Sequence, residues 1–273
     1  MNSSVSGPVI GVFDSGFGGL TVLKELIALI PYAEYLYFGD TARLPYGSKS
    51  VETVARYAVE ATRFLQAMHA NLLVIACNTA TALALDQITA AAQVPVVGVV
   101  EPGAEQAATS SNKRRVVVIG TEATVSSHAY LKALHQRGTE AREKACPLLV
   151  PLVEEGWVDH PVTEQVAMIY LQDAFGNGFE SADVLVLGCT HYPLIKPLLR
   201  RVAPAHIEIV DSAHSTARAV AEMVQSSRLA TPQKAGQPRL RFFATDSVEK
   251  FRRLGPSFLG HAIDTVEHVD LKE

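Results

Sequence analysis

The strongest constraint on the fold is a corner that the sequence contains twice, in which an apolar run ends on a cysteine and a small polar residue follows. The first corner is LLVIACNTAT at residues 72–81, around Cys77, and the second is VLVLGCTHYP at residues 184–193, around Cys189. Short apolar runs bounded by polar turns are typical of buried strands in a parallel sheet. The repetition of this corner predicts two similar units in the chain, each containing a parallel sheet.

Strand-like and helix-like patterns alternate along most of the chain. Apolar residues at helical spacing indicate helices over residues 20–30 and 51–70. Strands are predicted at residues 9–13, 35–40, 72–76, 94–100, 116–120, 147–153, 183–188, 207–210 and 239–245. This alternation predicts an α/β protein whose parallel-type sheets are flanked by helices.

Composition excludes several classes of protein. With 48% hydrophobic and 19% charged residues, a chain of 273 residues can bury the cores of two domains. A net charge of −4 gives no basic surface for nucleic acid or an anionic membrane. No apolar run is long enough to span a membrane, and MNSSVSGPV does not read as a signal peptide. Three cysteines without close spacing predict neither a disulfide framework nor a metal site, so we expect a cytoplasmic protein.

Polar side chains stand where the predicted strands end, in both halves of the chain. In the first half these are Asp14, Ser15, Asp40, Cys77, Asn78, Thr79 and Glu101, and in the second half Thr121, Glu154, Cys189, Thr190, His191 and Asp211. The intervals between them are nearly equal in the two halves, which indicates a duplicated unit. Because ligands bind beyond the carboxyl ends of parallel strands, two facing units would bring both thiols to one cleft.

Two thiols on opposite sides of a cleft suit the inversion of a carbon stereocentre, which needs a base on one face and an acid on the other. A helix N-terminus next to each cysteine is expected to lower the pKa of its thiol. Four further residues are candidate acid/base helpers: Asp14, Asp40, Glu154 and His191. The third cysteine, Cys146, is interpreted as an inert, buried small hydrophobe.

Six motifs, taken in order, resemble those of the glutamate racemases. They are GVFDSGFGGLTVL, GDTARLPYG, ACNTAT, GTEAT, PLVEEG and LGCTHYPL, and the resemblance spans roughly residues 9–213. It implies two similar α/β domains related by a pseudo-twofold axis, with the active site between them. It also implies that Cys77 and Cys189 interconvert L- and D-glutamate without a cofactor, supplying D-glutamate for peptidoglycan synthesis.

The resemblance further implies a role for individual residues of these motifs. Asp14 and His191 would tune the two thiols, with Asp40 and Glu154 behind them. The substrate-binding positions would be Asp14, Ser15, Pro45, Tyr46, Gly47, Asn78, Thr79, Thr121, Thr124, Thr190 and His191. Residues 1–98 and 212–273 would form the first domain and residues 99–211 the second. The sequence leaves a homodimer possible.

Other functions compete with this interpretation. The stretch DSGFGGL, followed by Asp40, imitates a dinucleotide-binding fingerprint, but Thr21 replaces its third small residue and Asp14 would repel a pyrophosphate. A cysteine hydrolase could use Cys189, His191 and Glu154, yet it would leave the first corner unexplained. A two-lobed ligand-binding protein would suit the predicted architecture, but binding alone would need no thiols. A racemase of the same fold acting on aspartate or a hydantoin is the nearest alternative.

Overall fold

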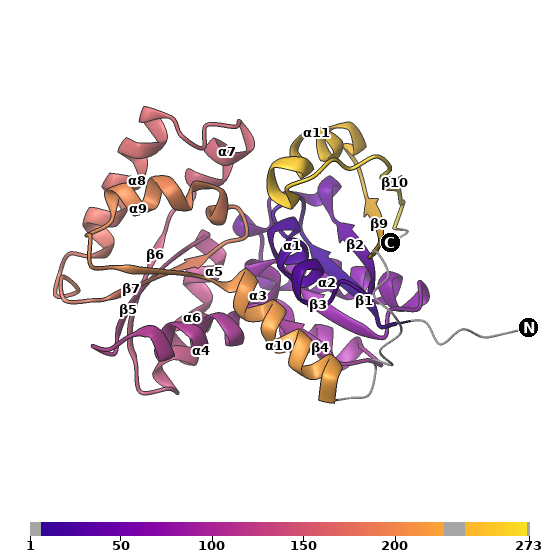
Figure 1. Cartoon of the computed structure of the whole chain (residues 1–273), viewed down its shortest axis with the longest axis horizontal. Coiled ribbons are helices and arrows are strands. Elements are labelled where there is room, and N and C mark those ends of the chain that lie inside the picture. The colour runs from indigo at the N-terminus through magenta and orange to yellow at the C-terminus, as the bar shows by residue number, and fades with distance from the viewer. Residues whose placement is uncertain (1–6, 227–237, 272–273) are drawn as a thin grey trace, which may run out of the picture.

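Two parallel β-sheets, each flanked by helices, organise the part of the chain that the computed structural model describes, residues 7–226 and 238–271 (Figure 1). The α/β class predicted from the alternating pattern is therefore confirmed. The parts of the predicted first domain at 1–6, 227–237 and 272–273 lie outside the described residues.

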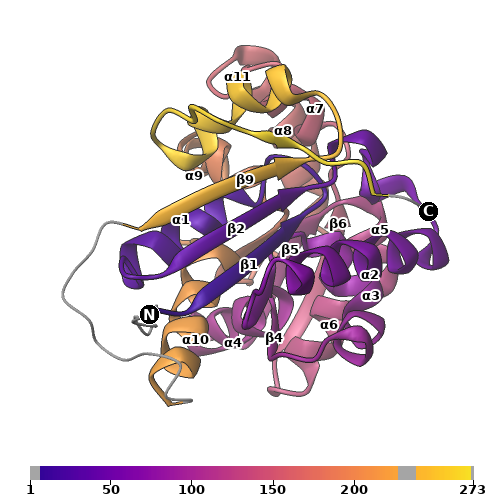
Figure 2. The same ribbon diagram turned by 90° about the vertical axis from the view of Figure 1, so that its right-hand side faces the viewer.

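The larger sheet has six strands in the order β10-β9-β2-β1-β3-β4, and every pairing in it is parallel. Its strands are β1 (Val9–Asp14), β2 (Glu34–Gly39), β3 (Leu72–Ile75), β4 (Val96–Gly98), β9 (Arg239–Ala244) and β10 (Glu267–His268). The strand predicted at 239–245 thus returns from the far end of the chain to pair with β2, as Figure 2 shows.

The smaller sheet repeats the central topology of the larger one. Its strands β5 (Arg115–Gly120), β6 (Glu140–Ala145), β7 (Val184–Gly188) and β8 (Glu208–Asp211) lie in the order β6-β5-β7-β8. This order corresponds to β2-β1-β3-β4, so β3 and β7 occupy equivalent places. Cys77 and Cys189 follow these two strands. The repeated corner in the sequence is therefore a repeated corner in the fold.

The prediction of a strand at residues 147–153 is wrong. Residues Leu149–Glu154 form helix α7, and the strand of this unit is β6, which the sequence analysis missed. β6 pairs only with β5, so it is an edge strand, and its side chains are exposed or half-buried. A charged edge strand carries no apolar run. Leu149 and Val153, four residues apart, form the buried face of α7.

Eleven α-helices in the described residues cover the two sheets. They are α1 (Leu20–Leu29), α2 (Val51–Ala67), α3 (Asn78–Ala91), α4 (Val100–Ser110), α5 (Glu122–Ser127), α6 (Ala129–His135), α7, α8 (Pro161–Ala174), α9 (Lys196–Val202), α10 (Ser212–Ser226) and α11 (Val248–Leu259). Within residues 7–226 and 238–271, none of these helices has the length and apolarity to cross a membrane.

We call the six-stranded sheet with α1, α2, α3 and α11 the first lobe, and the four-stranded sheet with α4–α9 the second lobe. Helix α10 leaves β8 of the second lobe and packs against both α1 and α4, so it bridges the lobes (Figure 1). The division of the chain into domains at residues 98 and 211 stays a prediction.

An aromatic cluster holds α11 on the first lobe. Phe251 of α11 is fully buried, and its ring lies 5.6 Å from that of Phe17 and 5.7 Å from that of Tyr37, both edge-on. Its ring is also 6.1 Å from that of Phe242 on β9. Edge-to-face contacts of this kind add to the stabilisation that burial of the ring provides.

We expect Phe251→Ala to lower the free energy of unfolding by about 3–5 kcal/mol, because it removes a buried ring from a packed cluster. Urea unfolding followed by circular dichroism measures the loss. Arg252→Ala, on the exposed side of the same helix, is the matched control and should change stability by less than about 0.5 kcal/mol. A loss below about 1 kcal/mol for Phe251→Ala would contradict this packing account.

Candidate active site

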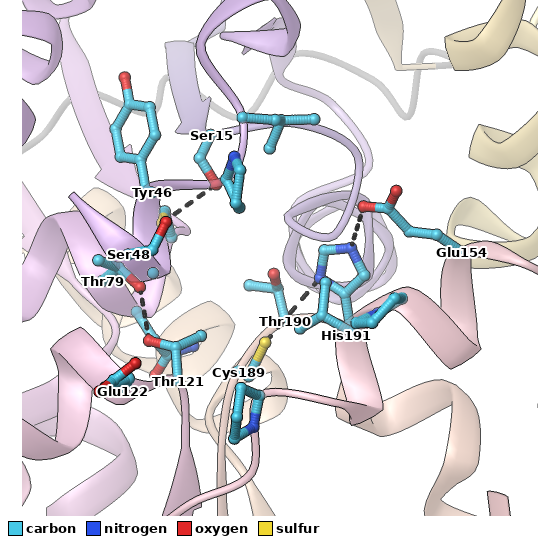
Figure 3. Close-up of a pocket in the computed structure, with 18 of the residues that line it drawn as sticks. Ser15, Tyr46, Ser48, Thr79, Thr121, Glu122, Glu154, Cys189, Thr190 and His191 are labelled. Carbon is cyan, nitrogen blue, oxygen red and sulfur yellow. Dashed lines mark hydrogen bonds and ion pairs between the residues drawn. The ribbon is translucent and has the colours of Figure 1, made fainter.

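A cleft of about 480 Å³ opens between the lobes, beyond the carboxyl ends of β1, β3, β5 and β7 (Figure 3). The first lobe contributes Ser15, Leu44, Pro45, Tyr46, Gly47, Ser48, Cys77, Asn78, Thr79 and Lys250 to its lining. The second lobe contributes Thr121, Glu122, Pro147, Val150, Pro151, Glu154, Cys189, Thr190 and His191. The predicted sharing of one cleft by both thiols is therefore observed.

Cys77 is the N-cap residue of α3. The backbone N–H of Ala80 donates to Cys77 Sγ at 3.4 Å, and the thiol donates to Ser15 Oγ at 3.4 Å. Burial, together with the nearby Asp14 carboxylate, raises the pKa of Cys77 to about 12. The expectation of a lowered pKa is therefore wrong for this residue, because burial outweighs the hydrogen bonds from the helix N-terminus. At neutral pH Cys77 holds its proton.

Cys189 has a different partner, a histidine two residues further along the chain. Cys189 Sγ lies 3.9 Å from His191 Nδ1, and His191 Nε2 lies 3.2 Å from Glu154 Oε1 (Figure 3). Although burial opposes the charge, the hydrogen bonds to Cys189 and Glu154 raise the pKa of His191 to about 10. An imidazolium therefore lies beside the sulfur atom of Cys189. The two cysteines thus have unlike surroundings.

Glu154 holds two cations with its two carboxylate oxygens. Oε1 faces His191, and Oε2 accepts from Lys250 Nζ at 2.8 Å. Although burial opposes ionisation, these two hydrogen bonds lower the pKa of Glu154 to about 2. Glu154 is therefore a carboxylate throughout the neutral range. Sequence reasoning missed Lys250, since a single lysine on an amphipathic helix carries no distinguishing signal.

Three of the predicted site residues lie behind the cleft wall. Asp14 is 1% exposed at the end of β1 and accepts from the Gly16 N–H at 2.8 Å through Oδ2, while burial raises its pKa. Asp40 accepts hydrogen bonds from Tyr46 and Thr245. Thr124 is the third. These residues support the side chains that line the cleft.

Hydroxyl and amide groups from both lobes also lie at the cleft. Thr79 Oγ1 of the first lobe lies 3.0 Å from Thr121 Oγ1 of the second lobe (Figure 3). It also lies 3.3 Å from Thr124 Oγ1, likewise of the second lobe. Asn78 Oδ1 accepts from Tyr130 at 2.7 Å. Its Nδ2 is buried and has no hydrogen-bond partner within the described residues, so it is a donor that a ligand in the cleft could satisfy.

The Gly-rich turn after β1 lets the two lobes approach each other closely. A Cβ atom on Gly18 would lie 2.2 Å from Thr190 Oγ1 and 2.6 Å from His191 Nδ1. Thr21 Oγ1 faces the carbonyl oxygen of Thr190 at 3.2 Å. Gly18 thus makes room for the Thr190–His191 corner of the second lobe.

Cys146 lies apart from this site. Its side chain is fully buried in the apolar core of the second lobe, and burial raises its pKa to about 12. It does not line the cleft. This agrees with the prediction that Cys146 is a structural residue.

Comparisons with known proteins identify the family. Residues 6–220 match the Asp/Glu/Hydantoin racemase family. The glutamate racemase of Koribacter versatilis (strain Ellin345) is 63% identical to this chain, over 97% of this chain and 98% of the relative. The chain belongs to the glutamate racemase family. It is therefore an isomerase, an amino-acid racemase, and the dinucleotide-binding and hydrolase alternatives are set aside.

Solved structures of glutamate racemases share the whole fold. The Bacillus anthracis enzyme is 37% identical, with a TM-score of 0.91 over 97% of this chain and 98% of the other. The Francisella tularensis enzyme, crystallised in complex with D-glutamate, is 35% identical, with a TM-score of 0.89 over 98% of both chains. The likeness thus covers both lobes.

We expect His191 to be an imidazolium at pH 7–8. Its raised pKa, about 10, means that the ring loses its proton only as the pH rises toward that value. Nuclear magnetic resonance of ¹⁵N-histidine-labelled protein, with the signal assigned through His191→Asn, measures the titration. Glu154→Gln should lower this pKa, because it removes one of the causes of the shift. A neutral ring at pH 8 in the unaltered protein would contradict the assignment.

Proposed function

We propose that this protein interconverts L- and D-glutamate by moving protons between the substrate α-carbon and two thiols, Cys77 and Cys189, without a cofactor. The observation that carries the proposal is the position of these thiols, which follow equivalent strands of the two lobes and line one cleft. A role in supplying D-glutamate for peptidoglycan synthesis goes with this activity, and we infer it from the family.

The unlike surroundings of the thiols provide one acid and one base at the same time. Cys77 retains its proton, and Cys189 lies beside the imidazolium of His191. In this state Cys189 takes the α-proton from one face and Cys77 delivers a proton to the other. Turnover in the reverse direction requires the opposite distribution of protons, with Cys189 protonated and Cys77 deprotonated. Asp14, beside Cys77, is the candidate group for returning a proton to that side.

Neutral donors are proposed to hold the substrate carboxylates. The free Nδ2 of Asn78 and the hydroxyl groups of Thr79 and Thr121 lie at the inter-lobe wall. Backbone N–H groups at the start of α3 add donors and a favourable dipole. The remaining substrate-binding positions of the proposal are Ser15, Pro45, Tyr46, Gly47, Thr190 and His191, with Asp14, Asp40, Thr124 and Glu154 acting from behind or beside them.

The relatives support glutamate, rather than aspartate or a hydantoin, as the substrate of this site. The curated relative at 63% identity is a glutamate racemase, and the Francisella tularensis enzyme was crystallised in complex with D-glutamate. A cleft of about 480 Å³ is of the size that small-molecule sites usually have.

We predict that Cys77→Ala and Cys189→Ala each lower kcat for L-glutamate racemisation at least a hundredfold, the order expected when a general acid or base is lost. Cys146→Ala, which removes a thiol outside the cleft, should retain most of the activity. Circular dichroism follows the loss of optical activity in purified protein with no cofactor added.

Two outcomes would contradict this proposal. A Cys77→Ala variant with near-normal turnover would rule out the two-thiol scheme. Loss of optical activity from L-aspartate as fast as from L-glutamate would rule out glutamate as the preferred substrate.

A further inference from the structure

We propose that Lys250 is a positioning residue for the second thiol, which it reaches through Glu154 and His191 from the opposite lobe. The inference rests on the proposed function in one respect, namely that Cys189 takes part in proton transfer. Lys250 itself stands outside the six motifs of the family resemblance.

A continuous series of polar contacts joins Lys250 to Cys189. Lys250 Nζ lies 2.8 Å from Glu154 Oε2, Glu154 Oε1 lies 3.2 Å from His191 Nε2, and His191 Nδ1 lies 3.9 Å from Cys189 Sγ. Each carboxylate oxygen of Glu154 thus has a separate partner. If Lys250 is removed, one oxygen is left free and the carboxylate can rotate away from the imidazole.

The contact between Lys250 and Glu154 crosses from one lobe to the other. Glu154 is the last residue of α7, whereas Lys250 lies on α11, next to the buried anchor Phe251. Lys250 Nζ also lies 5.4 Å from the centroid of the Phe17 ring, which belongs to the turn after β1. The ammonium group is therefore held on both sides, by an aromatic face and by a carboxylate.

Helix α11 also contacts the histidine directly. The Phe258 ring lies 5.3 Å from the His191 ring at an interplanar angle of 81°. One helix of the first lobe thus packs on the imidazole through Phe258 and fixes its carboxylate partner through Lys250. The geometry of the second thiol therefore depends on where α11 sits.

Charge supports the same assignment. Among the described residues that line the cleft, Lys250 is the one lysine or arginine, and Glu122 and Glu154 are the carboxylates. Without Lys250, one oxygen of Glu154 would lack a cationic partner and would repel an approaching dicarboxylate substrate. Pairing with Lys250 neutralises that carboxylate and leaves it able to hold His191.

A simpler role is electrostatic attraction of the anionic substrate, since the Lys250 side chain is 40% exposed. The two roles differ in what they change. Attraction alters substrate capture, so its loss raises KM and leaves Cys189 as it was. Positioning alters the state of Cys189, so its loss lowers kcat and the reactivity of that thiol even when no substrate is present.

The test compares Lys250→Met with the rescue variant Lys250→Arg. Arg252→Met is the matched control, because it removes a cation from the same helix. Among the described residues, the ion-pair partner of Arg252 is Glu249 of α11. Iodoacetamide labels the intact protein at pH 7, and peptide mass spectrometry gives the alkylation rates of Cys77 and Cys189 separately.

For Lys250→Met we expect the alkylation rate of Cys189 to fall about fivefold, the factor that a partly exposed ion pair supports, while that of Cys77 changes by less than about twofold. The kcat for glutamate should fall by a similar factor with little change in KM. Lys250→Arg should restore most of both losses, and Arg252→Met should change neither.

Unchanged alkylation of Cys189 in Lys250→Met, or an effect confined to KM, would overturn the proposal in favour of substrate attraction. An equal effect of Arg252→Met on the alkylation of Cys189 would also overturn the proposal, because it would show a general effect of positive charge on α11. Because alkylation is measured without turnover, this result stands apart from the proposed function. That function fails instead if alanine at Cys77 or Cys189 leaves racemisation intact.

Discussion

Close packing between Gly18 of the first lobe and the Thr190–His191 corner of the second is the contact on which the site depends. In the proposed reaction, Cys77 and Cys189 act on opposite faces of one carbon atom, so they must be held a fixed distance apart. They follow strands of separate sheets. The absence of a side chain at Gly18 lets the lobes meet at this distance, where a Cβ atom would lie 2.2 Å from Thr190 Oγ1. Contacts between Thr79 and Thr121 hold the opposite wall of the cleft.

The two halves share a topology and differ in chemistry. Cys77 is buried beside Ser15, a backbone N–H and the Asp14 carboxylate, and burial together with that carboxylate raises its pKa to about 12. Cys189 faces an imidazole that a carboxylate holds in place. A symmetric reaction is thus served by asymmetric surroundings. In the proposed mechanism, this asymmetry lets Cys77 act as the acid while Cys189 acts as the base.

Sequence reasoning succeeded where local pattern decides the structure. Cys77 and Cys189 were found because an apolar run followed by a small polar residue defines the end of a buried parallel strand. Sequence reasoning failed where contacts between distant segments determine the structure. The edge strand β6 has no apolar run, the pKa of Cys77 depends on burial by the whole lobe, and Gly18 is explained only by the second lobe. Lys250 becomes a site residue only when α11 packs on the first sheet.

Deuterium labelling tests the central claim, that different groups remove and deliver the proton. A thiol exchanges its proton with solvent, so in heavy water the donor thiol carries deuterium before turnover begins. The measurement is the deuterium content at the α-carbon of each glutamate enantiomer, separated on a chiral column at low conversion from either direction. Two opposed thiols predict label in the product while the remaining starting enantiomer keeps its hydrogen. Label in the starting enantiomer at a rate comparable to product formation would contradict the account.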